Sequence, residues 1–338
     1  MPSRWTVAVS PHVKSPESVE KIMWTVTACL LPSLILSTFV FGIQVLLITA
    51  VSVASCVAVE AISQKGLGRR VCVRDGSAVL TGLLIAFVIP PGVSPLLPAL
   101  GAVMAIFIGK HILGGLGYNI FNPALLGRAF LLATFPVAMT SAWLQPLDAT
   151  SIFHFFDSSV DAVTTATPLA VMKEQGMEAF VAQFGQGASL YKSFFLGWQP
   201  GCIGETSGFL LLLGGIFLLY RGYITWRIPV SVIGSVALLT WVFGGDTLFS
   251  GDPLLAVLTG GVMLGAIFMA TDYVTGPTNK ISQIVYGIGI GGLTVLIRLK
   301  GGYPEGVCYA ILLMNSMSPV LDAWFKPKRF ALPVGGDK

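Results

Sequence analysis

The chain has 338 residues, of which 54% are hydrophobic and only 11% are charged, and its mean hydropathy is +0.81. This composition excludes an ordinary soluble domain and indicates a polytopic membrane protein. The net charge of +4 is small and gives no reason to expect nucleic-acid binding, so the distribution of charge is interpreted as membrane topology.

Ten apolar segments predict an all-α protein with about ten transmembrane helices. About 20 apolar residues cross a bilayer core at 1.5 Å per residue, and backbone groups without water partners require helices there. The predicted spans are 22–41, 43–63, 77–89, 95–113, 124–143, 206–220, 228–243, 254–270, 284–297 and 307–323. The third, sixth and ninth are short, and no cleavable signal peptide is visible before the first.

The basic residues predict that both termini are cytoplasmic. With the N-terminus inside, fifteen basic residues fall in cytoplasmic segments: Arg4, Lys14, Lys21, Lys65, Arg69, Arg70, Arg74, Lys110, Arg221, Arg227, Lys280, Lys326, Lys328, Arg329 and Lys338. Four fall outside: Lys173, Lys192, Arg298 and Lys300. Arg128 is expected near the inner end of the fifth span, where its side chain can snorkel to water.

A five-residue match suggests an inverted repeat of five helices. The sequence Ala-Val-Leu-Thr-Gly occurs at 78–82 and again at 256–260, at the start of the third and eighth spans. Odd and even spans run in opposite directions, so the two halves are inverted, as in many transporters. The expected organisation is an arm and first repeat (1–143), an extracytoplasmic loop (144–205), and a second repeat with the C-terminal tail (206–338).

The five cysteines form no C-x-x-C pair and have no histidine cluster nearby. We therefore expect no zinc or iron–sulfur site built from this chain alone. The acidic residues fall near the predicted ends of spans: Glu60, Asp272 and Asp322 inside, and Glu205, Asp246, Asp252 and Glu305 outside. A mid-membrane charge usually marks a pathway, and its absence argues against a carboxylate proton relay through this chain alone.

Glycines at 114, 115 and 117 precede the segment 118–124, which contains Asn119, Asn122 and Pro123. The glycine spacing does not fit a dinucleotide-binding motif. One interpretation is an interhelical turn in which Asn122 caps the fifth helix and Pro123 opens it. The alternative is a broken segment in which Asn119 and Asn122 contact a flavin or an ion.

The polar stretch 161–170 lies in the longest segment without a predicted span, about 145–193. Thr167 and Pro168 predict a helix start, with Thr167 as N-cap and a surface helix over 169–184 that turns Glu174 and Glu178 outward. The residue before a proline is extended, so Thr167 can also present its hydroxyl to a modifying enzyme. A phosphate ester there would lie at a helix N-terminus, which favours an anion.

This stretch resembles the flavin-attachment motif of a family of membrane proteins that is shared by two complexes. One is the Rnf electron-transport complex, which has the family member as its D subunit, and the other is the sodium-pumping NADH:quinone reductase, which has it as its B subunit. The residues that match the motif are Asp161, Thr164, Ala166, Thr167, Pro168 and Leu169. The family often has Gly where Ala162 stands, and Gly or Gln where Thr165 stands. The resemblance also covers 75–78, 114–124, 271–272 and 301–306.

The resemblance implies a flavoprotein of a prokaryotic inner membrane. FMN would be joined through a phosphoester to Thr167 on the extracytoplasmic side, and a second, non-covalent riboflavin is implied without a motif that locates it. The complex would move electrons between ferredoxin and NAD, coupled to Na⁺ or H⁺ translocation, with flavin- and iron–sulfur-carrying partner subunits. The short N-terminal arm favours the Rnf branch over the quinone-reductase branch.

Two other classes of function compete with this one. A small-solute transporter or channel without redox activity suits the inverted repeat, but it leaves the motif at 161–169 unexplained. A structural anchor for peripheral redox subunits is the third. A covalent flavin that survives denaturation of the purified protein would discriminate between them.

Overall fold

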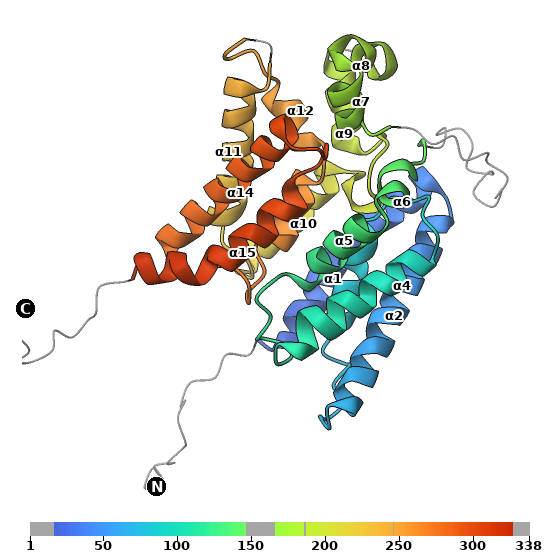
Figure 1. Cartoon of the computed structure of the whole chain (residues 1–338), viewed down its shortest axis with the longest axis vertical. Helices are drawn as coiled ribbons and strands as arrows, with labels where there is room; N and C mark the ends of the chain where they lie inside the picture. Colours follow the sequence, from blue (N-terminus) through green and yellow to red (C-terminus); the bar gives the residue numbers. More distant parts are fainter. Residues whose placement is uncertain (1–16, 147–165, 186, 246, 327–338) are drawn as a thin grey trace, which may run out of the picture.

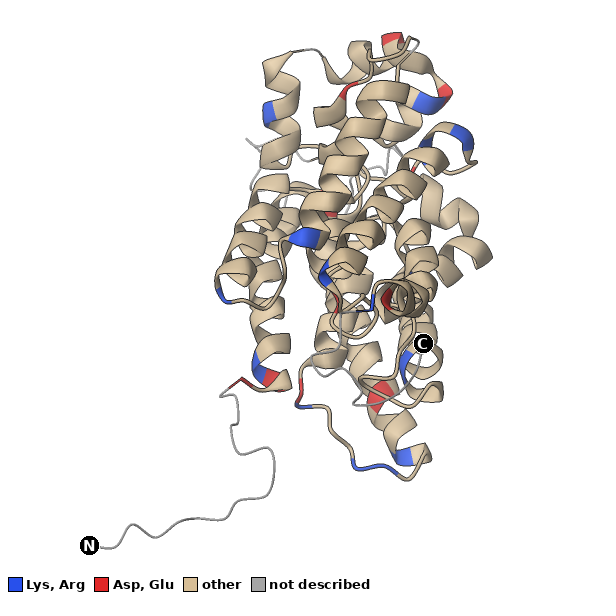
Figure 2. Cartoon of the chain, turned by 90° about the vertical axis from the view of Figure 1, so that its left-hand side faces the viewer, with Lys and Arg blue, Asp and Glu red and all other residues tan. Residues whose placement is uncertain are grey.

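The computed structural model describes residues 17–146, 166–185, 187–245 and 247–326, and every regular element among them is helical (Figure 1). This confirms the predicted all-α class. Four of these helices are long and apolar enough to cross a membrane: α1 (Val19–Phe41), α2 (Gln44–Gly66), α14 (Lys280–Lys300) and α15 (Val307–Trp324). Figure 2 shows that most of the helical surface carries neither acidic nor basic residues, as a lipid-facing surface requires.

The helices form an N-terminal and a C-terminal group, which lie side by side in Figure 1. The N-terminal group adds α3 (Ser77–Phe87), α4 (Leu96–Val103), the π-helical segment η1 (Met104–Ile112), α5 (Pro123–Thr134) and α6 (Pro136–Ser141) to α1 and α2. The C-terminal group adds η3 (Ile203–Glu205), α10 (Gly208–Tyr220), α11 (Arg227–Phe243), α12 (Pro253–Leu258), α13 (Val262–Leu264) and η4 (Gly265–Met269) to α14 and α15.

A small helical unit follows the N-terminal group along the chain. It consists of α7 (Pro168–Glu174), α8 (Gly176–Phe184) and α9 (Ala188–Leu196), which lie at the top of Figure 1. Its own apolar cluster includes Val171, Phe180 and Phe194, and Leu255 of α12 completes it. The unit is thus packed against the C-terminal group.

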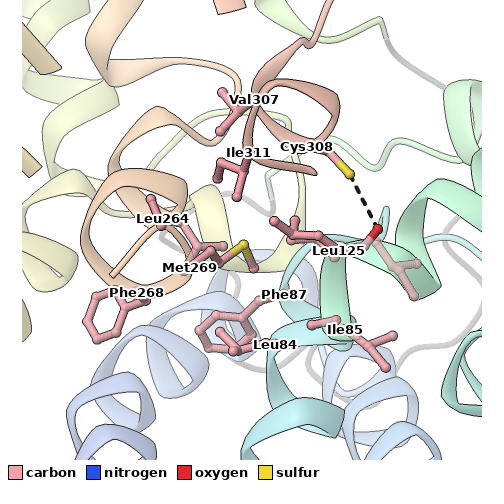
Figure 3. Packing of buried hydrophobic residues seen from close by; sticks show 14 of the residues in the cluster. Leu84, Ile85, Phe87, Leu125, Leu264, Phe268, Met269, Val307, Cys308 and Ile311 are labelled. Atoms are coloured by element: carbon pink, nitrogen blue, oxygen red, sulfur yellow. Dashed lines mark hydrogen bonds between the residues drawn. The ribbon is translucent and has the colours of Figure 1, made fainter. Parts of the chain in front are cut away.

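The two groups share one apolar core. Figure 3 shows Phe87 of α3 and Leu125 of α5 facing Met269 of η4 and Ile311 of α15. Cys308 of α15 donates to the backbone oxygen of Leu125 at 3.5 Å, consistent with a cysteine that packs as a small apolar residue.

The connections between helices meet alternately at two ends of the molecule. At one end, three hydrogen bonds join Trp24 to Arg74, Tyr223 to Glu17, and Thr278 to Asp322. At the other end, three more join Gly92 to Ala142, Ile203 to Ile89, and Tyr191 to Asp252. These six hydrogen bonds join connecting segments that are distant in the sequence.

The predicted eighth span, 254–270, is not one helix. It is interrupted between α12 and α13, where Gly260 and Gly261 have φ values of 64° and 69°. Glycine adopts this left-handed geometry without steric cost. Arg298 donates to the backbone oxygens of Ala256 and Thr259 at 2.7 and 2.8 Å, so the carbonyls freed by the break have partners.

Two other predicted spans have wrong boundaries. The fifth, 124–143, is divided into α5 and α6 at Phe135, because Pro136 begins a new helix. The ninth, expected to be short at 284–297, is the 21-residue helix α14, which starts after the N-cap Asn279 and includes charged residues at both ends. Apolar periodicity alone misses such polar helix ends.

Candidate functional site

Thr167 begins α7 in the way that the Thr-Pro pair predicts. Its backbone is extended, with φ −64° and ψ 155°, and its hydroxyl oxygen accepts a hydrogen bond from the Ala170 amide at 3.3 Å. Pro168 takes the first helical position, where a missing N–H leaves no unmade bond. Thr167 is 3% exposed, and Ala166 before it is half-buried.

The single helix predicted over 169–184 is wrong, because two helices occupy this stretch. The chain turns after α7 at Gly176, whose φ of +86° lies in the left-handed region. Glu174 and Glu178 are both exposed, as predicted. The turn lets α8 pack Phe180 into the small unit instead of extending α7 into solvent.

Thr167 lies at the wall of a cavity of about 300 Å³. The cavity has contributions from α5, α6, α7, the 302–305 loop and α15, and its lining includes the aromatic side chains Trp143, Tyr303 and Tyr309. The rings of Tyr303 and Tyr309 are stacked, with centroids 5.9 Å apart. A cavity of this volume with aromatic walls and a few polar groups is typical of an organic ligand site.

Lys173 holds α7 against this cavity. Its ammonium group donates to the backbone oxygen of Gly301 and to that of Tyr303, the latter at 3.0 Å. The loop between α14 and α15 is therefore fixed to the helix that begins after Thr167. This holds the Thr167 hydroxyl and the aromatic side chain of Tyr303 at fixed relative positions.

Arg128, Glu305 and Glu174 are the charged residues of the cavity wall, and the first two lie close together. These two form an ion pair in which both side chains are largely buried, and Arg128 also donates to the Cys202 sulfur at 3.8 Å. The prediction that Arg128 snorkels to water at the inner end of its span is wrong. The ion pair with Glu305 satisfies its charge inside the protein instead.

Glu205, expected outside the spans, is buried in η3 behind this ion pair. Burial and, next, the carboxylate of Glu305 raise the pKa of Glu205 to about 8. Sequence reasoning missed this grouping, because Arg128, Glu205 and Glu305 are widely separated along the chain.

Asn119 and Asn122 lie elsewhere, in a second cavity of about 90 Å³ lined also by Thr271 and Asp272. Asn122 is the N-cap of α5, as one interpretation predicted: its side-chain oxygen accepts from the Ala124 amide at 3.0 Å. Its side-chain nitrogen donates to the backbone oxygen of Met269 at 3.2 Å, which joins the two helix groups. The structure does not bring these asparagines together with Thr167.

A buried ion pair beside the second cavity was also missed. Lys110 donates to both carboxylate oxygens of Glu60 at 2.8 and 2.7 Å and to the Ser77 hydroxyl at 2.7 Å, and Lys110 and Glu60 are 2% and 1% exposed. The position of Glu60 near a helix end gave no sign of this burial. The sequence feature that could have predicted the pair is that Glu60 and Lys110 carry opposite charges and both lie in apolar segments, where each charge needs a partner.

Asp161 and Thr164 of the attachment motif lie outside the described residues. Ala166, Thr167 and Pro168 therefore carry the described part of the motif, and they connect the polar stretch to the start of α7.

Comparison with known proteins adds a family. The model of the family described as "NQR2, RnfD, RnfE family" matches residues 6–331. The D subunit of the proton-translocating ferredoxin:NAD(+) oxidoreductase complex of Clostridium ljungdahlii is 49% identical over 327 residues, covering 96% of each chain. The D subunit of the Na(+)-translocating ferredoxin:NAD(+) oxidoreductase complex of Acetobacterium woodii is 42% identical over 328 residues, covering 97% of this chain and 95% of that one. The D subunit of the ion-translocating oxidoreductase complex of Vibrio cholerae is 36% identical, covering 96% and 98%.

Proposed function

The chain belongs to the NQR2, RnfD, RnfE family, and from this we propose that it is the D subunit of an ion-translocating ferredoxin:NAD(+) oxidoreductase complex. Its partners are then the other membrane and peripheral redox subunits of the complex, which carry flavins and iron–sulfur clusters. The single observation that carries the flavin role is the 300 Å³ aromatic cavity that opens beside the Thr167 side chain.

Covalent FMN on Thr167 is the central part of this proposal. The phosphoester forms at the hydroxyl oxygen, which lies where α7 starts and borders the cavity. Asp161, Thr164, Ala166 and Pro168 serve as the sequence read by the flavin transferase. Because Thr167 is only 3% exposed, an attached flavin extends into the cavity and not into bulk water.

The cavity residues fit a flavin by shape and polarity. Trp143, Tyr303 and Tyr309 offer flat apolar surfaces for the isoalloxazine ring, and the Arg128 guanidinium offers hydrogen-bond donors and positive charge beside it. The bound flavin would supply electron transfer in one- or two-electron steps. The protein supplies the orientation of the ring, the exclusion of water and the local charge.

A non-covalent riboflavin is the second cofactor that we propose, with Asn119 and Asn122 as candidate contacts. The cavity beside them has a volume of about 90 Å³. Organic ligands usually fill about 300–1,000 Å³, so this cavity would have to widen to accept a flavin ring.

The proposed topology has ten spans in two inverted five-helix repeats within the inner membrane. The termini are cytoplasmic and the Thr167 loop faces the other side. Its support is the alternation of helix connections between two ends and a packing pattern common to the two groups. If each group is counted in predicted spans, the second span packs on the fourth and the fourth packs on the fifth. In the N-terminal group these contacts are α2 with α4 and α4 with α5, and in the C-terminal group they are α11 with α14 and α14 with α15.

The alternative within the family is the B subunit of a Na⁺-translocating NADH:quinone reductase. The curated relatives described above are all D subunits, and the chain covers at least 95% of the two most identical of them. This end-to-end correspondence favours the ferredoxin:NAD(+) complex.

Intact-mass and peptide analysis of the protein, purified from cells that contain a flavin transferase, tests the proposal. One FMN-sized adduct is expected on the peptide that contains Thr167. Thr167→Ala should abolish the adduct, whereas Thr164→Ala and Thr165→Ala should leave an acceptor hydroxyl at Thr167. An adduct on Thr164 or Thr165, or none in the native complex, would refute the assignment.

A further inference from the structure

Two buried carboxylates and one guanidinium meet at the Thr167 cavity: Glu305 and Arg128 line it, and Glu205 lies next to Glu305 without lining it. A carboxylate oxygen of Glu205, one of Glu305 and the Cys202 sulfur all lie within 4.8 Å of one another. Arg128 is ion-paired with Glu305 and lines the cavity together with it. Glu205 is not part of the cavity lining, so it forms a second layer behind the pair.

Two guanidinium groups act on Glu205, but only Arg128 forms an ion pair with a carboxylate of the cluster. The titratable and charged groups that act on Glu205 are Arg128 of α5, Arg298 of α14, Glu305 of the loop before α15 and Cys202 next to η3. Cys308 of α15 acts on Arg128 and Glu305. The Arg298 guanidinium donates its hydrogen bonds to the backbone oxygens of Ala256, Thr259 and Gly260, at the break between α12 and α13. One directly paired cation therefore serves two buried carboxylates, an arrangement that favours a shared proton.

Glu205 also touches the interruption between α12 and α13. A Cβ atom placed on Gly261 would lie 2.9 Å from a Glu205 carboxylate oxygen, and Gly261 has a φ of 69°. The carboxyl group is thus packed between the cavity wall and the break in the eighth span. A change of charge at Glu205 acts on both.

We propose that Glu205 and Glu305, with Arg128 paired to Glu305, form a proton-binding site whose occupancy is coupled to the redox state of a flavin in the Thr167 cavity. The proposal rests on the proposed function, since it requires that flavin. It gives a role to the carboxyl groups of Glu205 and Glu305, which lie outside the attachment motif.

The coupling balances charge and atoms. The electron comes from a one-electron iron–sulfur carrier of the complex and leaves to the next carrier. As it arrives, a proton from water at the cavity adds to a carboxylate oxygen of the Glu205–Glu305 pair. When the electron leaves, that O–H bond breaks and the proton returns to water. The added positive charge compensates the added negative charge at short range, where the low dielectric makes the interaction strong.

A metal ion fits the same three residues less well. The Arg128 guanidinium already occupies the cation position, bonded to Glu305 and 3.8 Å from the Cys202 sulfur. A divalent cation there would face this positive charge directly. The observed pairing therefore favours a proton over a metal.

The test is a spectroelectrochemical titration of the purified complex between pH 6 and 10. Spectra of the Thr167→Ala complex are subtracted to isolate the signal of the covalent flavin. The Glu205→Gln complex is compared with the Glu178→Gln complex, which carries a matched substitution at an exposed site on α8. The midpoint potential of the wild type and of Glu178→Gln should fall with pH above about 8, the region to which the raised pKa of Glu205 points. Glu205→Gln mimics the protonated carboxyl, so this extra fall should be lost. Identical profiles in all three proteins would overturn the proposal.

Infrared difference spectra of the wild-type complex at pH 9 give a second readout that needs no variant to assemble. Reduction should produce a carboxylic-acid C=O band that shifts in D₂O, and its absence overturns the proposal. Stoichiometric bound metal that Cys202→Ser removes would also contradict it. Absence of the adduct on Thr167 refutes the proposed function itself, whereas an adduct with unchanged pH profiles refutes only this inference.

Discussion

The Arg128 side chain of α5 forms an ion pair with Glu305, which lies 177 residues further along the chain in the loop before α15. The pair joins the two helix groups and also forms part of the wall of the Thr167 cavity. Packing between the groups and the electrostatics of the candidate flavin site therefore depend on the same contact.

Replacing Arg128 with Met should destabilise the protein strongly. Glu305 would remain buried without its cation, and loss of one partner of a buried pair typically costs about 3–5 kcal/mol. The double variant Arg128→Met with Glu305→Gln should regain part of this loss. Thermal unfolding of the detergent-purified protein measures both. Equal stability of the single variant and the wild type would show that the pair contributes nothing.

Gly82→Ala should weaken the contact between α3 and α2. A Cβ atom at Gly82 would lie 2.6 Å from the Val53 Cα atom, so the backbones must separate. Overpacking of this kind typically costs about 1–3 kcal/mol. Gly234→Ala in α11 is the control, since nothing lies within 4 Å of its added methyl group. Unfolding temperatures should fall for the first and stay level or rise for the second; the reverse order would contradict the packing.

Cys72 offers a direct test of topology, because it is the exposed one of the five cysteines. A membrane-impermeant maleimide should label it in inside-out vesicles and not in intact cells, as expected for the loop before α3. A cysteine introduced at Glu178, in a Cys72→Ser background, should show the opposite pattern. Labelling of Cys72 from outside would mean that the predicted span count is wrong by one.

Stability should depend on pH through Glu205. Burial first, and then the Glu305 carboxylate, raise its pKa from 4.5 to about 8. Between these values the folded protein holds a proton that the unfolded chain has released, so stability declines as pH rises through about 8. The wild-type unfolding temperature should fall more between pH 6 and 9 than that of Glu205→Gln, whereas Glu178→Gln should follow the wild type. Parallel curves for all three would exclude this linkage.

Loss of Thr167, the proposed site of flavin attachment, should affect electron transfer and ion movement together. In a complex assembled with Thr167→Ala, both ferredoxin-to-NAD electron transfer through the membrane arm and the accompanying ion gradient are expected to fall. Thr165→Ala, which keeps the acceptor, is the matched control. Ion pumping at normal yield per transferred electron without this flavin would contradict the proposed role.

Sequence alone was sufficient for the features that depend on local chemistry. A high content of apolar residues predicted membrane helices, because an isolated backbone in lipid must bond within its own segment. Thr167 and Pro168 predicted a helix start, and Asn122 with Pro123 predicted another, since capping depends on adjacent residues. The described helix starts agree with both.

The tertiary structure decided the features that depend on distant contacts. The sequence predicted that the Arg128 side chain reaches water, but the fold places Glu305 beside it. The sequence also did not specify that Lys110 is the partner of Glu60. The break at Gly260 is stable because Arg298, from another helix, donates to the exposed carbonyls. Local sequence sets which residues begin and end helices, but a buried charge takes its partner from whichever helix packs against it, and only the packed chain specifies that neighbour.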